Sequence, residues 1–203
     1  MKQYNRVVLL SGGVDSAYIL HKVTRKFVEG GPRARSSSLG VGDKTVALFV
    51  DYGQPSASAE WLSAQAIAEA VCVPISRVDV AGVGLGDMGN REGARVVPAR
   101  NLWLIALAAA FLPVSAPPIP QVGFSRDQVW IGAAPQDHDD YLDCREIFLE
   151  EMRRSMLLLG NDLRWSDAAR EERVLCLETS TLLELTHSCY EEVACGECPS
   201  CLQ

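Results

Sequence analysis

The chain has 203 residues, 48% of them hydrophobic, and this length supports one sizeable α/β core and not clearly two. Its formal net charge of −7 argues against a broad positive surface for nucleic acid, so there is no strong nucleic-acid signal. No run approaches the roughly 18 apolar residues of a membrane span, and the first residues lack a signal-peptide pattern. We therefore expect a cytoplasmic protein without a membrane partner.

Apolar runs and helical patterns alternate along the chain. Strands that alternate with helices imply βαβ units, so we expect an α/β, Rossmann-like fold with a mainly parallel, five-stranded sheet. Ligands of such sheets bind outside the carboxyl ends of the strands. The predicted strands are Arg6–Leu10, Thr45–Val50, Pro74–Val80 and Val129–Ala133, and the predicted helices begin at Ala17 and cover Ala57–Val71, Arg100–Phe111 and Asp143–Leu159.

The last three helices differ in their apolar patterns. The helix Arg100–Phe111 is apolar nearly all round, which indicates a buried helix. The other two are amphipathic. Their predicted apolar faces are Trp61, Ala64, Ile67, Ala68 and Val71 in Ala57–Val71, and Phe148, Met152, Met156 and Leu159 in Asp143–Leu159.

A glycine-rich loop, Ser11–Ser16, lies between the first strand and the first helix, in the context that makes such a loop a phosphate-site candidate. Gly12 and Gly13 let the backbone approach an anion closely, and the N–H groups of the loop and of the helix start supply partial positive charge. Ser11 and Ser16 add hydroxyl groups, while Asp15 can orient the loop or meet a metal ion. The loop lacks the Gly-Lys-Ser/Thr of a Walker A motif; a capped strand–helix turn is the structural alternative.

Four cysteines crowd the last fifteen residues, and in a reducing compartment such a cluster indicates a metal site. Three of them are separated by two intervening residues each, so neighbouring sulfurs can converge on one ion. Four thiolates satisfy tetrahedral Zn²⁺ with no open position, which favours a structural zinc. An iron–sulfur cluster takes the same ligands and remains an alternative. The candidate ligands are Cys189, Cys195, Cys198 and Cys201.

The string Ser11-Gly12-Gly13-Val14-Asp15-Ser16 resembles the signature of the PP-loop ATP pyrophosphatase superfamily. The resemblance implies that ATP is split between its α- and β-phosphates while a carbonyl or carboxylate oxygen is adenylated. A nucleophile, often ammonia or sulfur, then displaces AMP.

Further strings, in order along the chain, are similar to those of the 7-cyano-7-deazaguanine synthase family. The resemblance runs from about Arg6 to Cys201 and implies one domain over 1–203 with a zinc-binding tail at 186–203. The strings are Asp51-Tyr52-Gly53-Gln54 with Glu60, Val97–Asn101, Trp130–Ala133, Asp137 with Tyr141–Arg145, Thr186–Tyr190, and Cys195-Gly196-x-Cys198-x-x-Cys201.

This second resemblance implies the conversion of 7-carboxy-7-deazaguanine to its nitrile with ammonia and two ATP, Mg²⁺, a structural Zn²⁺ and, at family level, a homodimer. Asp15, Ser16, Arg100 and Arg145 are the candidate catalytic residues, because an arginine fork suits carboxylates and phosphates. Surface salt bridges and solvated loop acids are the structural alternatives for the charged residues. The candidate ATP-binding residues are Ser11–Ser16 and Asp51, and the candidate substrate-binding residues are Arg100, Asn101, Asp137, Tyr141, Asp143 and Arg145.

The chain also departs from the family pattern. Ala99 replaces a glycine, Pro55 replaces a basic residue, and the segment between Gly160 and Thr186 is short and lacks a lysine. The arginine that follows the last cysteine in the family is also missing. We expect the loss of these basic groups to cost transition-state stabilisation unless Arg164, Arg170 or Arg173 substitutes for them.

The short segment between Gly160 and Thr186 would open the site to a larger nucleophile than ammonia. A second hypothesis is therefore an antiphage (CBASS-type) relative, a ligase that transfers the adenylated acid to a protein amine. A third is a non-catalytic nucleotide-binding homologue.

Overall fold

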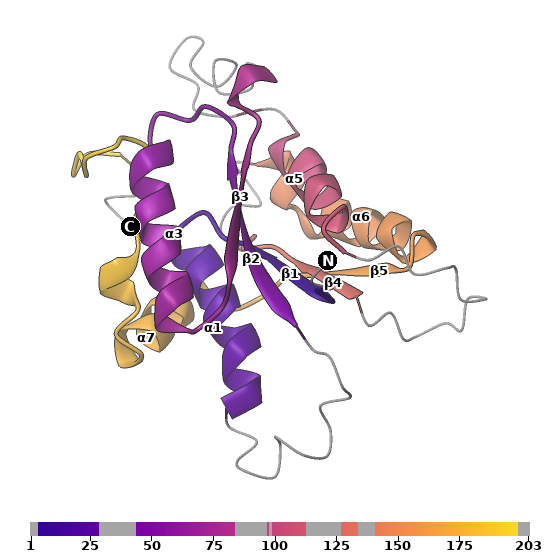
Figure 1. The fold of residues 1–203 in the computed structure, drawn as a ribbon, viewed down its shortest axis with the longest axis horizontal. Coiled ribbons are helices and arrows are strands. Elements are labelled where there is room, and N and C mark those ends of the chain that lie inside the picture. Colours follow the sequence, from indigo (N-terminus) through magenta and orange to yellow (C-terminus); the bar gives the residue numbers. More distant parts are fainter. Residues whose placement is uncertain are drawn as a thin grey trace.

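The computed structural model describes residues 4–28, 44–83, 97, 99–112, 127–133 and 141–198 (Figure 1). Two candidate site residues, Asp137 and Cys201, lie outside these ranges. No helix in the described ranges is long and apolar enough to cross a membrane.

Five parallel strands form the sheet, in the order β3-β2-β1-β4-β5, which confirms the predicted α/β class. All carboxyl ends therefore lie at one edge, where ligands of such sheets bind. The fifth strand was not located from the sequence, because its four residues hold only one large apolar side chain, Leu163. The strands are β1 (Arg6–Leu9), β2 (Thr45–Asp51), β3 (Ile75–Asp79), β4 (Asp127–Trp130) and β5 (Asn161–Arg164).

Helices cover both faces of the sheet (Figure 1). One face carries α1 (Val14–Val28), α3 (Ala57–Ala70) and α7 (Arg170–Thr179). The other carries α5 (Arg100–Ala109) and α6 (Glu146–Leu158). Three short 3-10 turns complete the described elements: η1 (Ala81–Val83), η4 (Leu142–Cys144) and η5 (Leu183–Leu185).

The alternation of side chains along β1 separates the two cores. Val8 packs with Phe49 and the α1 and α3 side chains, whereas Val7 and Leu9 pack with Ile105 of α5. Of these five residues, all except Leu9 are at most 1% exposed. A strand buried on both faces needs a continuous apolar run, which is what β1 has.

Three sequence predictions need correction. The strand predicted at Val129–Ala133 spans Asp127–Trp130, so Ile131–Ala133 follows it as a loop at the ligand-binding edge. In α6, Leu159 is 70% exposed and Leu149 is buried instead, because the helix ends at Leu158. The helix α5 is not buried all round: Leu102 is 43% exposed, and only one side faces the sheet. The predicted apolar face of α3 is confirmed.

Candidate active site

The Ser11–Ser16 loop curls around its own serine hydroxyls. Ser16 Oγ donates to the Gly13 carbonyl at 3.0 Å and accepts from the Ser11 N–H at 3.2 Å. The two serine Oγ atoms lie 3.1 Å apart. Ser16 is 6% exposed, so its hydroxyl shapes the loop from the inside. Helix α1 begins within this segment, at Val14, with its amino end at the carboxyl edge of the sheet, where helix N–H groups favour an anion.

Two glycines allow the loop to lie against its neighbours. Gly12 has φ of +88°, and a Cβ there would lie 2.6 Å from the Glu60 carbonyl oxygen of α3. Gly132, in the loop after β4, lies under the start of α1, where a Cβ would be 2.8 Å from Ser16 N. Both distances are shorter than any real Cβ contact, so each position needs glycine. Gly13 differs, because its nearest neighbour, Ser188 Oγ, would be 3.5 Å away.

Asp15 is held by Arg173, which the sequence analysis named only as one of three possible substitutes for the missing charge. Arg173 of α7 is 0% exposed, and its Nη1 lies 2.9 Å from Asp15 Oδ1. The guanidinium of Arg173 also donates to the carbonyls of Ala133, Ser166 and Ala168. Arginine patterns in the sequence gave no sign of this pairing, since Arg173 is 158 residues from Asp15.

The C-terminal tail lies directly on the loop. His187 N donates to the Gly12 carbonyl at 2.9 Å, and Val14 N donates to Ser188 Oγ at 3.4 Å. Farther along the tail, the hydroxyls of Tyr190 and Tyr141 are 3.5 Å apart. The fold therefore brings together the first motif, the tail and the segment that begins at Tyr141.

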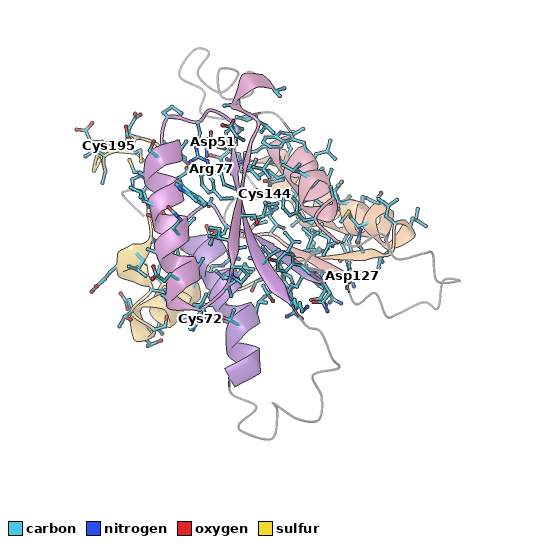
Figure 2. All side chains as sticks on the ribbon, viewed as in Figure 1. Asp51, Cys72, Arg77, Asp127, Cys144 and Cys195 are labelled. Carbon is cyan, nitrogen blue, oxygen red and sulfur yellow. The ribbon has the colours of Figure 1, made fainter. Side chains whose placement is uncertain are left out.

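Asp51 ends β2 and already has protein partners. Its Oδ1 accepts from Gly53 N at 3.0 Å, and its Oδ2 lies 2.5 Å from Arg77 Nη2 (Figure 2). The same turn holds the carboxylate of Glu60, which accepts from Gln54 and Ser56 at 2.8 and 2.7 Å. These contacts fix the turn after β2 and the start of α3, on which Gly12 packs.

A second polar cluster joins α5 to η4. Asn101 N donates to Asp143 Oδ2 at 2.8 Å, and Asn101 Nδ2 donates to the Asp143 carbonyl at 3.1 Å and to Cys144 Sγ at 3.3 Å. Asp143 thereby satisfies one of the unpaired N–H groups at the start of α5. Asn101 is 4% and Cys144 3% exposed, so this part of the cluster holds two segments together.

Arg100 and Tyr52 complete that cluster. Burial is the largest cause that raises the pKa of Tyr52, and the Arg100 guanidinium, which donates to its hydroxyl, only partly offsets it. Burial works against the charge on Arg100, but Tyr52, Cys144 and Asp143 outweigh it and leave the pKa of Arg100 raised. Arg100 is therefore a fixed cation beside a neutral phenol. The Tyr52 ring meets Trp103 edge-on, with centroids 5.6 Å apart.

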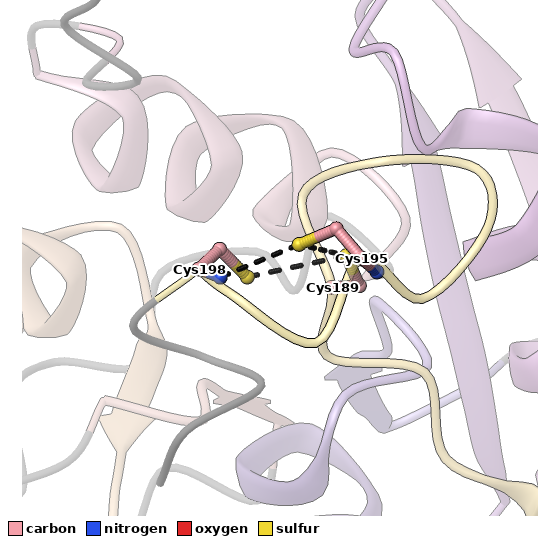
Figure 3. A group of neighbouring side chains, drawn as sticks. All are labelled: Cys189, Cys195 and Cys198. Atoms are coloured by element: carbon pink, nitrogen blue, oxygen red, sulfur yellow. Dashed lines mark hydrogen bonds between the residues drawn. The ribbon is translucent and has the colours of Figure 1, made fainter.

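Three cysteines of the tail converge (Figure 3). Their sulfur atoms all lie within 4.8 Å of one another, with Cys189 Sγ 3.5 Å from Cys195 Sγ and 3.9 Å from Cys198 Sγ. Tetrahedral Zn–S bonds of about 2.3 Å put sulfurs about 3.8 Å apart, so these separations fit. Backbone N–H groups also donate to the sulfurs, for example Cys195 N to Cys189 Sγ at 3.3 Å, and such bonds favour thiolates.

Comparison with known proteins identifies the family. A sequence profile described as "Queuosine biosynthesis protein QueC" matches residues 86–203, more than half of the chain. The chain belongs to the QueC family. It is 30% identical to the 7-cyano-7-deazaguanine synthase of Koribacter versatilis, over 97% of this chain and 85% of that protein. It is 29% identical to the Thermoplasma volcanium protein of the same name, over 96% of this chain and 82% of that protein.

A solved structure shares the fold. The U34-tRNA thiolase NcsA from Methanococcus maripaludis, with its [4Fe-4S] cluster, matches 98% of this chain with a TM-score of 0.54 and 16% sequence identity. The chain spans 63% of that protein's length. At this identity the likeness bears on the PP-loop fold alone.

The QueC motifs thus meet at one edge of the sheet, with two kinds of exception. Arg145 lies at the start of α6, and its side chain is exposed. Asp137 and Cys201 fall outside the described residues. The sequence analysis did not name Ser188 and Tyr52 as individual site residues, although both stand inside quoted motifs. It named Arg173 only as a possible substitute for the missing charge, and no motif assigned Arg173 to Asp15.

Proposed function

We propose that this QueC-family chain binds ATP over Ser11–Ser16 and adenylates the carboxylate of 7-carboxy-7-deazaguanine. The observation that carries the proposal is the loop itself, fixed between β1 and α1 at the carboxyl edge of the sheet and covered by the tail. The similarity to proteins named 7-cyano-7-deazaguanine synthase supports this substrate and a role in queuosine biosynthesis.

The first step of the proposed reaction is an acyl adenylation. A carboxylate oxygen attacks the α-phosphorus of ATP, a P–O bond forms, and the bond from the α-phosphorus to the bridging oxygen breaks, which releases pyrophosphate. Ammonia then attacks the acyl carbon, loses a proton and displaces AMP to give the amide. A second ATP adenylates the amide oxygen, and loss of AMP and protons leaves the nitrile.

We assign roles to the candidate residues within this reaction. Arg100, a half-buried cation beside the Tyr52 hydroxyl, pairs with the substrate carboxylate or an ATP phosphate. The second carboxylate oxygen of Asp15 meets Mg²⁺. The remaining proposed contacts to ATP and the deazaguanine come from Asp51, Asn101, Asp137, Tyr141, Asp143 and Arg145.

For the metal, we propose that Cys201 completes a Zn²⁺ site with the three converging cysteines. The sulfur separations support tetrahedral coordination, and a closed four-thiolate site is structural. An iron–sulfur cluster is the alternative ligand of the same set. Metal analysis of the purified protein distinguishes zinc from iron. An iron–sulfur cluster should also absorb light at about 350–450 nm.

A second candidate function is a ligase that transfers the same acyl group to a protein amine. The observation that favours it is that Arg164 and Arg173 do not replace the missing lysine as free cations. Arg164 pairs with Asp162, and Arg173 is fully buried against Asp15 and three carbonyls. Among the described residues, two of the three candidate arginines are thus engaged by protein partners, while the proposed adenylating loop is intact.

One assay separates these functions. The protein is incubated with ATP, Mg²⁺ and 7-carboxy-7-deazaguanine, with and without ammonia, and pyrophosphate, AMP and the deazaguanine products are measured. Nitrile formed only with ammonia supports the synthase. Pyrophosphate release without nitrile, together with added mass on a co-expressed partner protein, supports the ligase. No pyrophosphate under any of these conditions rejects both and leaves a non-catalytic homologue.

A further inference from the structure

Arg173 is the most deeply enclosed charge in the described part of the chain. It lies in α7, is 0% exposed, and also contacts the Tyr18 ring, with the guanidinium carbon 5.6 Å from the ring centroid. Its guanidinium donates four hydrogen bonds: to Asp15 at 2.9 Å, and to the carbonyls of Ala168, Ala133 and Ser166 at 2.8, 3.0 and 2.7 Å. A buried guanidinium with this many partners is fixed in place.

These partners come from three different parts of the ligand-binding edge. Asp15 belongs to the phosphate loop, Ala133 follows β4, and Ser166 and Ala168 follow β5. Arg173 therefore ties the loop to the carboxyl ends of two strands. It has no exposed surface, so it is placed to act on a ligand through Asp15 and not by direct contact.

The charge of Asp15 gives this arrangement a function. The Asp15 carboxylate stands in the loop that we propose holds the ATP phosphates, where an uncompensated negative charge repels them. Arg173 supplies the opposite charge from the side of the core and holds Oδ1 of the Asp15 carboxylate.

We propose that Arg173 is a positioning residue that neutralises and orients Asp15 so that the loop accepts the phosphates of ATP. This inference rests on the proposed function, because it assumes that ATP binds over Ser11–Ser16. It goes beyond that function by assigning the loop's charge balance to a residue in the α7 core.

The test is a double-mutant cycle on binding of α,β-methylene-ATP, which cannot be split between its α- and β-phosphates. Binding is measured by calorimetry without Mg²⁺, so that the proposed Mg²⁺ contact of Asp15 does not contribute. Arg173→Met should raise the Kd about tenfold or more, because Asp15 is left unpaired. Adding Asp15→Asn to Arg173→Met should recover most of that loss, since no uncompensated carboxylate remains. Inorganic pyrophosphate, as a second probe, should follow the same order.

A purely structural role for Arg173 predicts otherwise, because replacing Asp15 would then not restore binding to a protein damaged at Arg173. A folded double variant that binds no better than Arg173→Met overturns the inference. Arg173→Lys keeps the charge and loses the fork, so it should bind within a few-fold of the wild type even if Arg173→Met does not fold. Failure of a folded Arg173→Lys to bind also overturns the inference.

Arg153→Met is the matched control. Arg153 makes an ion pair of 2.8 Å with the buried Asp162, away from the loop, so this substitution should leave the Kd unchanged. If the wild type binds neither probe, the proposed function fails and this inference with it. If the wild type binds and rescue is absent, only the inference fails.

Discussion

His187 donates its backbone N–H to the carbonyl of Gly12 at 2.9 Å, and this bond joins the two ends of the chain at the proposed ATP site. The next residue, Ser188, accepts from Val14 N, and Cys189, a proposed metal ligand, follows immediately. The cysteine cluster and the phosphate loop are thus linked through three consecutive tail residues. A change in the cysteine cluster should therefore alter the phosphate loop, and a change in the loop should alter the cluster.

Removing the metal should therefore weaken ATP binding. Chelation, or Cys189→Ser, should disorder the tail and raise the Kd for α,β-methylene-ATP by about tenfold, since the loop loses its His187 and Ser188 contacts. Calorimetry before and after chelation, with metal content measured on the same samples, checks this. Cys72→Ser, an exposed cysteine outside the cluster, is the control and should retain both metal and binding. Unchanged nucleotide affinity in the metal-free protein would show that metal binding and nucleotide binding are not coupled.

Alanine substitutions at Gly12 and Gly13 should have different effects, one on stability and the other on ATP binding. Gly12→Ala places a Cβ 2.6 Å from a backbone oxygen at a φ of +88°, so we expect the free energy of unfolding to fall by about 2 kcal/mol or more. Gly13→Ala meets only ordinary contacts from 3.5 Å, so it should fold normally and lose ATP affinity instead. Urea unfolding and nucleotide binding on both variants separate the two effects. Equal stability losses would contradict the distinction.

Gly132 supports the loop from beneath. Gly132→Ala puts a Cβ 2.8 Å from Ser16 N, so the loop must shift, and we expect both lower stability and weaker binding of α,β-methylene-ATP. Gly82→Ala is a matched control, because a Cβ there has nothing within 4 Å and the residue has no positive φ. That variant should behave as the wild type in thermal unfolding. An undisturbed nucleotide Kd in Gly132→Ala would show that this contact does not shape the loop.

Tyr52 should make stability depend on alkaline pH. Its folded pKa is raised above the ordinary value of about 10, chiefly by burial. The folded state thus holds the phenol proton more tightly than the unfolded state. The resulting contribution is present in full below about pH 10 and is lost as pH rises through the folded pKa.

Tyr52→Phe should remove this part of the loss of stability at alkaline pH. Thermal unfolding from about pH 9 to about pH 11, a range around the ordinary phenol pKa, measures the effect. The pKa of Tyr18 is also raised by burial, so Tyr18→Phe serves as a parallel variant. A Tyr52→Phe curve parallel to the wild type across this range would count against the argument.

Much of the fold followed from local patterns in the sequence. The apolar runs of β1 and β2 are continuous because both strands are buried on both faces, and periodicity found the buried face of α3. The weak points were short elements. Strand β5 is short and mostly polar although three of its four residues are buried, and helix α7 carries mixed polar residues, so local hydrophobicity did not reveal either element.

The site divides in the same way. The loop Ser11–Ser16 and the cysteine spacing were determined by the sequence itself, because backbone freedom and ligand spacing are local properties. Only the tertiary structure decided that His187 rests on Gly12, that Asp51 pairs with Arg77, and that Arg173 meets Asp15. These pairs are distant in sequence, and their geometry depends on how strands and helices pack. Charge compensation inside a core is a property of that packing, so no motif records it.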